Sequence, residues 1–137
     1  MFKTVLVPVD LTDKNRRAIE VACELATPGG TVTTFHVIET IDAPFEELQD
    51  FYKRLEDQAR EHMNAMCAPF RSRDVTLQEL VVYGRRAPQI VQHAQTNPVD
   101  LIVITSHRMD PDHPEHGFMS ISHQIALVAP GPVLVLR

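Results

Sequence analysis

The chain alternates short runs of consecutive apolar residues with longer segments in which apolar residues recur at helical spacing. The first run, VLVPVD, puts Val5, Leu6, Val7 and Val9 in a strand that ends at Asp10. A short, continuous apolar run is typical of a strand buried on both faces of a parallel sheet. Further strands are predicted on the same grounds over 31–38, 75–83, 101–104 and 133–136.

The segment after Asp10 is predicted to be a helix, because its apolar residues lie three or four positions apart. Thr12 or Asp13 would cap this helix, which would run to about Ala26. The PGG sequence at 28–30 is expected to end it.

Further helices are predicted over 44–70, over 87–96 and from Ser120 to Pro130, with Gly84 turning the chain before the second of them. The apolar stripe expected on the long helix consists of Leu48, Phe51, Leu55, Ala59, Met63, Met66 and Phe70. Strands that alternate with helices in this way predict a single doubly wound α/β domain over 1–137, with a mostly parallel five-stranded sheet in the order 3-2-1-4-5. The winding then reverses between strands one and four, and ligands bind at such a crevice. Asp10 and the segment that starts at Thr105 should face it.

The composition of the chain argues against several classes of function. Hydrophobic residues make up 44% and charged residues 23% of the chain, which is typical of soluble globular proteins. The net charge of -5 argues against nonspecific binding to nucleic acid and against binding to anionic membrane surfaces. No apolar run approaches the roughly 20 residues of a membrane span, and no signal peptide is recognisable. We therefore expect a cytoplasmic protein in which Cys23 and Cys67 are free thiols on the inward sides of helices.

Taken together, these landmarks resemble the universal stress protein family across the whole chain. The matching pieces are VLVPVD at 5–10, FHVIE at 35–39, the turn at Gly84, DLIVI at 100–104 and APGPVLVLR at 129–137. The resemblance implies a Rossmann-like fold of the adenine nucleotide alpha hydrolase-like type, usually as a dimer. In one branch of the family it also implies an adenine nucleotide, ATP or AMP with magnesium, at the crevice between strands one and four.

The adenine side of that implied site is intact in this chain. The resemblance places the base against Pro8, Asp10 and Val37, and Val9 lies within the same stretch. The aspartate would accept a hydrogen bond from the purine edge.

The phosphate side departs from the family pattern, which is G-x2-G-x9-G-[S/T]. The first two glycines fall on Thr105 and Arg108, the third falls on Met119, and the hydroxyl position falls on Ser120. The span between the second and third positions is also one residue longer than the pattern. Side chains at glycine positions obstruct both close backbone approach and positive φ. Nucleotide affinity is therefore expected to be reduced or lost.

Other features of the same segment favour an anion. The hydroxyls of Ser120 and Ser122 lie at the start of the last helix, and Arg108 could offer a charged fork to phosphate. Gly117 supplies one permissive backbone position nearby. The candidate residues on this side are Thr105, Ser106, His107, Arg108, Gly117, Ser120 and Ser122.

Two roles fit Asp10. Its carboxylate could bind a ligand in the crevice, or it could cap the helix that follows. The resemblance favours binding. His36 lies among apolar neighbours, which favours a hydrogen-bonded core histidine over a catalyst.

The segment after Thr105 raises two further functional hypotheses. A zinc or nickel site would draw on His107, Asp110, Asp112, His113, His116 and His123, but no recognised ligand spacing is present, so a solvated polar loop is favoured and no metal is predicted. Hydrolase chemistry would use Ser106 and His107. Adjacent serine and histidine do not make a triad, and no G-x-S-x-G elbow surrounds the serine, so no catalytic residue is predicted.

The last strand would form an apolar edge made of Val133, Leu134, Val135 and Leu136. Pairing with a second copy is an economical way to cover such an edge, which predicts a homodimer. The sequence thus predicts a cytoplasmic, non-catalytic regulatory module, with an unidentified protein partner as a further expectation. The alternative is an ATP-binding switch whose nucleotide orders 105–118, and a weak ATPase ranks third.

Overall fold

The computed structural model describes residues 1–41, 45–106, 112 and 120–137. Within these residues, five strands form one sheet in the order β3-β2-β1-β4-β5, and each neighbouring pair is parallel. The strands are β1 (Phe2–Pro8), β2 (Ala26–Glu39), β3 (Thr76–Gly84), β4 (Leu101–Thr105) and β5 (Val133–Leu136). The predicted strand order is therefore confirmed.

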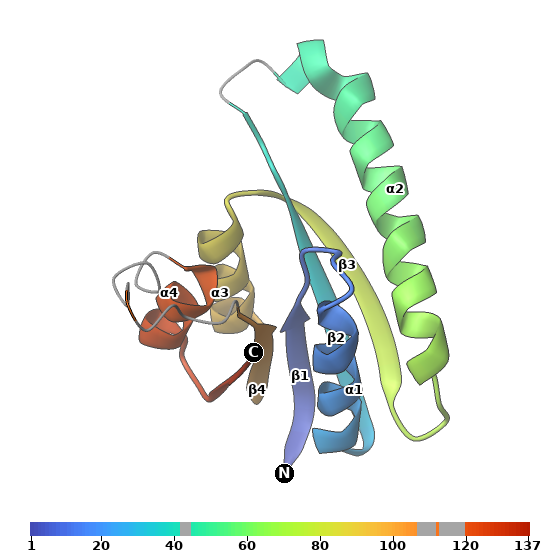
Figure 1. Cartoon of the computed structure of the whole chain (residues 1–137), viewed down its shortest axis with the longest axis vertical. Helices are drawn as coiled ribbons and strands as arrows, with labels where there is room; N and C mark the ends of the chain where they lie inside the picture. The colour runs from blue at the N-terminus through green and yellow to red at the C-terminus, as the bar shows by residue number, and fades with distance from the viewer. Residues whose placement is uncertain (42–44, 107–111, 113–119) are drawn as a thin grey trace.

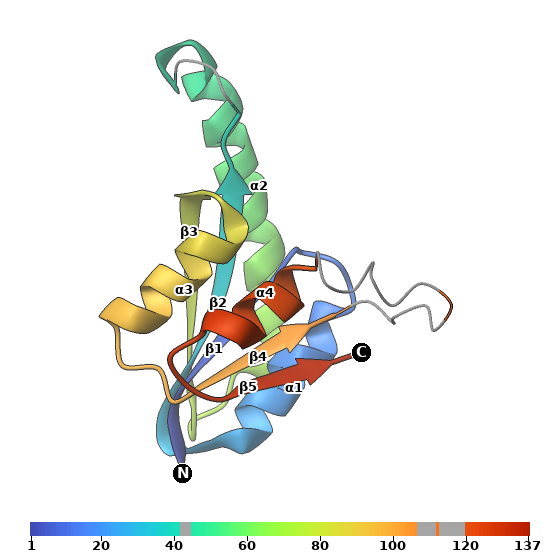
Figure 2. The ribbon, with the colours of Figure 1, turned by 90° about the vertical axis from the view of Figure 1, so that its left-hand side faces the viewer.

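Helices cover both faces of the sheet (Figures 1 and 2). The described helices are α1 (Asn15–Leu25), α2 (Gln49–Cys67), α3 (Arg86–Thr96) and α4 (Ile121–Val128), with short 3-10 helices η1 (Phe45–Leu48) and η2 (Ala68–Phe70) at the two ends of α2. Ile19 of α1 and Met63 of α2 belong to one core cluster, whereas Ile90 of α3 and Ile125 of α4 belong to the other. The doubly wound arrangement is confirmed.

Strand β1 explains why its sequence is apolar at consecutive positions. Val5 and Val7 pack toward α1 and α2, while Leu6 packs toward α3 and α4. All three side chains are at most 1% exposed. Because successive side chains of a strand point to opposite faces, a strand between two helical layers needs apolar residues at every position.

The predicted cap of α1 was wrong. The helix begins at Asn15, and the residue before it, Lys14, makes no side-chain capping bond. Thr12 instead lies in the turn that precedes the helix, where its carbonyl accepts a hydrogen bond from the Asn15 N–H at 3.1 Å. Thr12 and Asp13, which the sequence pattern placed at the start of the helix, therefore lie in this turn.

The predicted role of the PGG sequence was also wrong. Helix α1 ends at Leu25, and β2 begins at once, so residues 28–30 lie inside the strand. The pairing of β1 with β2 shifts here from Phe2 opposite Ala26 to Thr4 opposite Thr31. Gly29 has a φ of +84°, which an L side chain rarely adopts. The glycines therefore serve a bulge, not a helix terminus.

The apolar stripe of α2 differs at one turn from the prediction. Phe51 is 44% exposed, whereas its neighbour Tyr52 is 1% exposed. The Tyr52 hydroxyl accepts a hydrogen bond from the Ile41 N–H at 2.9 Å, and its ring contacts Tyr83 edge-on at a centroid distance of 5.8 Å. Tyr52 can be buried here because its hydroxyl has a hydrogen-bond partner in the backbone of Ile41, just beyond the end of β2.

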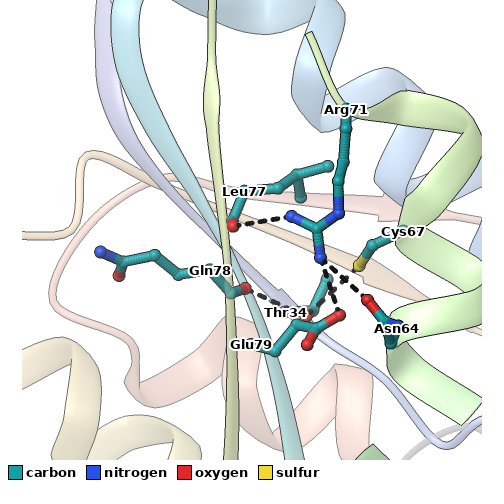
Figure 3. A network of polar contacts seen from close by, with 7 residues as sticks. All are labelled: Thr34, Asn64, Cys67, Arg71, Leu77, Gln78 and Glu79. Carbon is teal, nitrogen blue, oxygen red and sulfur yellow. Dashed lines mark hydrogen bonds and ion pairs between the residues drawn. The ribbon is translucent and has the colours of Figure 1, made fainter. Parts of the chain in front are cut away.

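Arg71 fastens the end of α2 to β3 (Figure 3). Its guanidinium donates to the Leu77 carbonyl at 3.3 Å and to the Glu79 carboxylate at 3.1 Å. It also reaches the Asn64 side-chain oxygen at 3.4 Å. One planar fork thus links helix and strand at three points.

Cys67 takes part in a second contact of α2 with the sheet (Figure 3). The Thr34 hydroxyl donates to the Gln78 carbonyl at 3.1 Å, so the Cys67 thiol is the donor across its 3.8 Å contact with the same hydroxyl. Cys23 and Cys67 are both free thiols, and burial raises the pKa of each. The prediction of inward-facing, unpaired cysteines is confirmed.

None of the helices in the described part of the chain has both the length and the apolar character needed to cross a membrane.

Candidate functional site

A cavity of about 260 Å³ opens at the carboxyl ends of β1, β2 and β4. It lies where the winding of the sheet reverses between β1 and β4, which is the place that a doubly wound sheet predicts for a ligand. The predicted site residues that the structure describes all line it: Pro8, Val9, Asp10, Val37, Thr105, Ser106, Ser120 and Ser122. His107, Arg108 and Gly117 lie outside the described residues.

Several lining residues were not predicted from the sequence. Phe35, Ile90 and Ile104 form apolar walls, Asn15 comes from the start of α1, and Arg86 comes from the start of α3. Asn15 carried a usable signal in the sequence, because it is a polar residue at an inward position of an amphipathic helix. In the structure its side chain is 2% exposed. Arg86 carried none, since only the tertiary fold brings α3 to this cavity.

Asp10 is held by the turn that follows β1. Its Oδ1 accepts hydrogen bonds from the Thr12 N–H at 3.0 Å and from the Thr12 hydroxyl at 2.7 Å. Its own N–H donates to the Asn15 side-chain oxygen at 3.0 Å. Leu11 between them has a φ of +69°, an unfavourable conformation for a leucine. Within the described residues, Oδ2 makes no hydrogen bond and is the oxygen that can receive a ligand.

The carboxyl of Asp10 is ionised at neutral pH. Partial burial opposes the charge, but the hydrogen bonds from Thr12 and the positive charge of Arg86 outweigh it, so the pKa of Asp10 lies below its usual value. The two roles weighed for Asp10 are therefore compatible in this geometry. One oxygen secures the turn, and the other presents a negative acceptor at the edge of the cavity.

His36 lies just behind this turn. Its Nδ1 is 2.9 Å from the Val9 carbonyl oxygen, and because a carbonyl only accepts, Nδ1 carries a proton. Burial is the main cause that lowers the pKa of His36, and the charge of Arg86 adds to it. The ring is therefore neutral at neutral pH. The expected hydrogen bond is confirmed, but His36 is half-buried and does not belong to the core.

Serine hydroxyls gather on the opposite side of the cavity. The Ser122 hydroxyl donates to Ser106 Oγ at 2.8 Å, and Ser120 Oγ lies 3.3 Å from Ser122 Oγ. Ser120 caps α4 by accepting from the His123 N–H at 3.2 Å, as predicted for the start of the last helix. The cluster joins the end of β4 to the amino terminus of α4.

Thr105 is the last residue of β4 and also lines this side. Its Oγ1 is buried and has no hydrogen-bond partner among the described residues. A buried hydroxyl without a partner costs about 1–3 kcal/mol.

Among the described residues, no group of three or more His, Cys, Asp or Glu side chains is placed to hold a metal ion. Of the metal-ligand candidates in the sequence, Asp112 and His123 are described. His107, Asp110, His113 and His116 lie outside the described residues.

Comparison with known proteins agrees with this architecture. The sequence model of the Universal stress protein family matches residues 1–137. Comparison with curated proteins finds no match. Among solved structures, universal stress protein UspA from Lactobacillus plantarum is similar with a TM-score of 0.70 and 23% identity, over 98% of this chain and 97% of that chain.

Two further solved structures are similar. A universal stress protein in complex with cAMP has a TM-score of 0.66 and 20% identity, over 99% of this chain and 97% of that chain. A universal stress protein family protein from Arabidopsis thaliana with AMP bound has a TM-score of 0.63 and 20% identity, over 98% of this chain and 90% of that chain. These likenesses show a shared fold.

Proposed function

Because the chain belongs to the universal stress protein family, we propose that it is a non-catalytic regulatory module of the stress response that acts in the cytoplasm as a homodimer. Its crevice seats an adenine base and holds the phosphates of the nucleotide weakly. The observation that carries this proposal is the preformed cavity in which Asp10 offers one acceptor oxygen and Thr105 occupies the position of the family's first phosphate-loop glycine.

The adenine side is supported by its geometry. Asp10 keeps Oδ2 for the exocyclic amine of a purine, and Phe35, Val37 and Ile90 supply apolar surface for the ring. Two similar structures are described with cAMP and with AMP. An ionised carboxylate over an apolar wall is a suitable receptor for a base that presents an amine.

The weak hold on phosphate is supported by the side chain of Thr105. A glycine at this position would leave its backbone N–H open to a phosphate, whereas the threonine adds a Cβ and a buried hydroxyl. The hydroxyls of Ser106, Ser120 and Ser122 can still bind one phosphate or a ribose. A nucleoside monophosphate suits this side better than a triphosphate.

The absence of catalysis is proposed from the chemistry of the same residues. The pKa of Asp10 is lowered, and a carboxylate that holds its charge so firmly is a poor general base. Ser106 Oγ accepts a hydrogen bond from the Ser122 hydroxyl at 2.8 Å, and accepting a hydrogen bond makes this oxygen a weaker nucleophile.

Thermal unfolding with and without nucleotide tests the proposal. We expect millimolar AMP to raise the Tm by on the order of 1–5 °C, and ATP with magnesium to do no better, as ligands near their Kd do. Asp10→Asn should abolish the rise, because one amide group cannot accept from both Thr12 and the purine amine. No rise with AMP would contradict the adenine side of the proposal.

Thr105→Gly tests the phosphate side. Glycine at position 105, as in the family pattern, should enlarge the rise in Tm that ATP causes, measured against the same variant without ligand. Comparison within the variant removes the cost of a glycine in β4. An unchanged response to ATP would show that Thr105 does not weaken phosphate binding.

The second candidate function is an ATP-dependent switch, and one observation favours it. Ser106 and Ser120 both line the cavity, so the segment between them starts and ends at the ligand site. A Tm rise on the order of 10 °C with ATP, as for a ligand at about 100 times its Kd, would favour the switch. Release of phosphate above background would favour the weak ATPase.

A further inference from the structure

A second cavity, of about 400 Å³, lies on the other face of the end of β2, between that strand and α2. Its walls include Leu11, His36, Leu55 and Ala59. The carboxyl end of β2 runs beside α2 and extends past the end of β1, whose last residue, Pro8, pairs with Phe35 (Figures 1 and 2). The end of β2 forms one side of the second cavity, and α2 forms the other.

The two cavities meet at a shared boundary. Val37 and Arg86 line both of them. Asp10 lines the first cavity, and the next residue, Leu11, lines the second. A group attached to an amine that is hydrogen-bonded to Asp10 would therefore lie at the entrance to the second cavity.

The second cavity offers apolar surface beside polar side chains, among them Gln58 and His62 of α2. Leu11, Leu55 and Ala59 give it apolar surface. The ring of His36 is fixed in its wall by the hydrogen bond to the Val9 carbonyl. Arg86 and Glu39, which also line the cavity, lie 3.8 Å apart as an ion pair, so their charges offset one another.

We propose that the second cavity receives a small alkyl or aryl group carried on the exocyclic N6 of an adenine nucleotide whose base lies in the first cavity. This inference rests on the proposed function, because the base must lie against Asp10. It names the ligand class of the site as N6-substituted adenine nucleotides. One hydrogen of the secondary amine still donates to Asp10, and the substituent crosses the boundary between Val37 and Arg86.

Calorimetric titration with AMP and with N6-benzyl-AMP tests the inference. We expect the benzyl compound to bind about tenfold or more tightly, since burying a group of this size is equivalent to at least one factor of ten in affinity. Equal or weaker binding of the benzyl compound would overturn the inference. AMP binding by itself reports on the proposed function, so the two can fail separately.

A matched pair of variants on α2 tests whether the gain in affinity comes from the second cavity. Gln58 lines the second cavity and is exposed, so Gln58→Trp should fill the cavity and remove the advantage of the benzyl group while leaving AMP binding unchanged. Glu61 is exposed on the same helix outside the cavity lining, so Glu61→Trp should retain the advantage. An advantage that survives Gln58→Trp would overturn the inference, as would failure of the benzyl compound to bind the unmodified protein.

Discussion

At the scale of single residues, Asp10 shows how one side chain serves both structure and binding. Its Oδ1 closes the turn through Thr12, and its backbone N–H is held by Asn15. A carboxylate fixed in this way loses little conformational entropy when it binds a ligand. The turn that places Leu11 at positive φ therefore also orients the proposed base receptor.

His36 gives a prediction about pH. Burial places its pKa below the ordinary value of about 6.5, so the unfolded chain takes up a proton at a higher pH than the folded protein does. Stability should then fall as the pH drops below about 6.5. His93, whose pKa is lowered by burial beside Phe35, should contribute in the same direction.

The measurement is the free energy of unfolding by denaturant at pH 7.5 and pH 5.5. His36→Asn, whose amide nitrogen takes the position of Nδ1 and can still donate toward Val9, should lose less stability between the two pH values than the unmodified protein. Equal losses would mean that His36 does not couple folding to protonation.

At the scale of elements, the start of β2 depends on the close approach of two backbones. A Cβ on Gly30 would lie 2.6 Å from the Lys3 carbonyl oxygen and 2.9 Å from the Thr27 carbonyl oxygen. Neither carbonyl can withdraw without disturbing the bulge between β1 and β2. The glycine lets β2 continue directly from the end of α1.

Gly30→Ala should therefore lower the free energy of unfolding by about 1–3 kcal/mol, as overpacking does. Gly131 is the matched control, because a Cβ there meets nothing within 4 Å. Gly131→Ala should be neutral or stabilise by up to about 1 kcal/mol. Denaturant unfolding of both variants makes the comparison, and equal effects would contradict the role given to Gly30.

At the scale of the whole molecule, the sheet has two edges, β3 and β5. Val133 and Val135 of β5 pack toward α3 and α4, and Leu134 and Leu136 pack toward α1 and α2, yet all four stay partly exposed. A second copy that continued the sheet past β5 would cover them further. The proposed homodimer uses this edge.

Leu134→Lys should produce monomers, because a charge buried at a paired edge costs more than a four-residue strand pairing can offset. Leu80→Lys, at a 37% exposed position of β3, should leave the dimer intact. Light scattering after size exclusion gives the mass of each, with circular dichroism to check folding. A dimer of the Leu134 variant, or monomers of the unmodified protein, would refute this interface.

The sequence by itself determined that five strands form, their order and the position of Asp10, but not where β2 begins, because burial on two faces and right-handed crossovers leave few arrangements for these apolar runs. Only the tertiary structure decided where α1 begins, why Tyr52 and not Phe51 is buried, and that Arg86 joins two cavities. Local pattern reports which residues avoid water. Contacts between elements far apart in the chain depend on how those elements pack, and no periodicity within one segment records that.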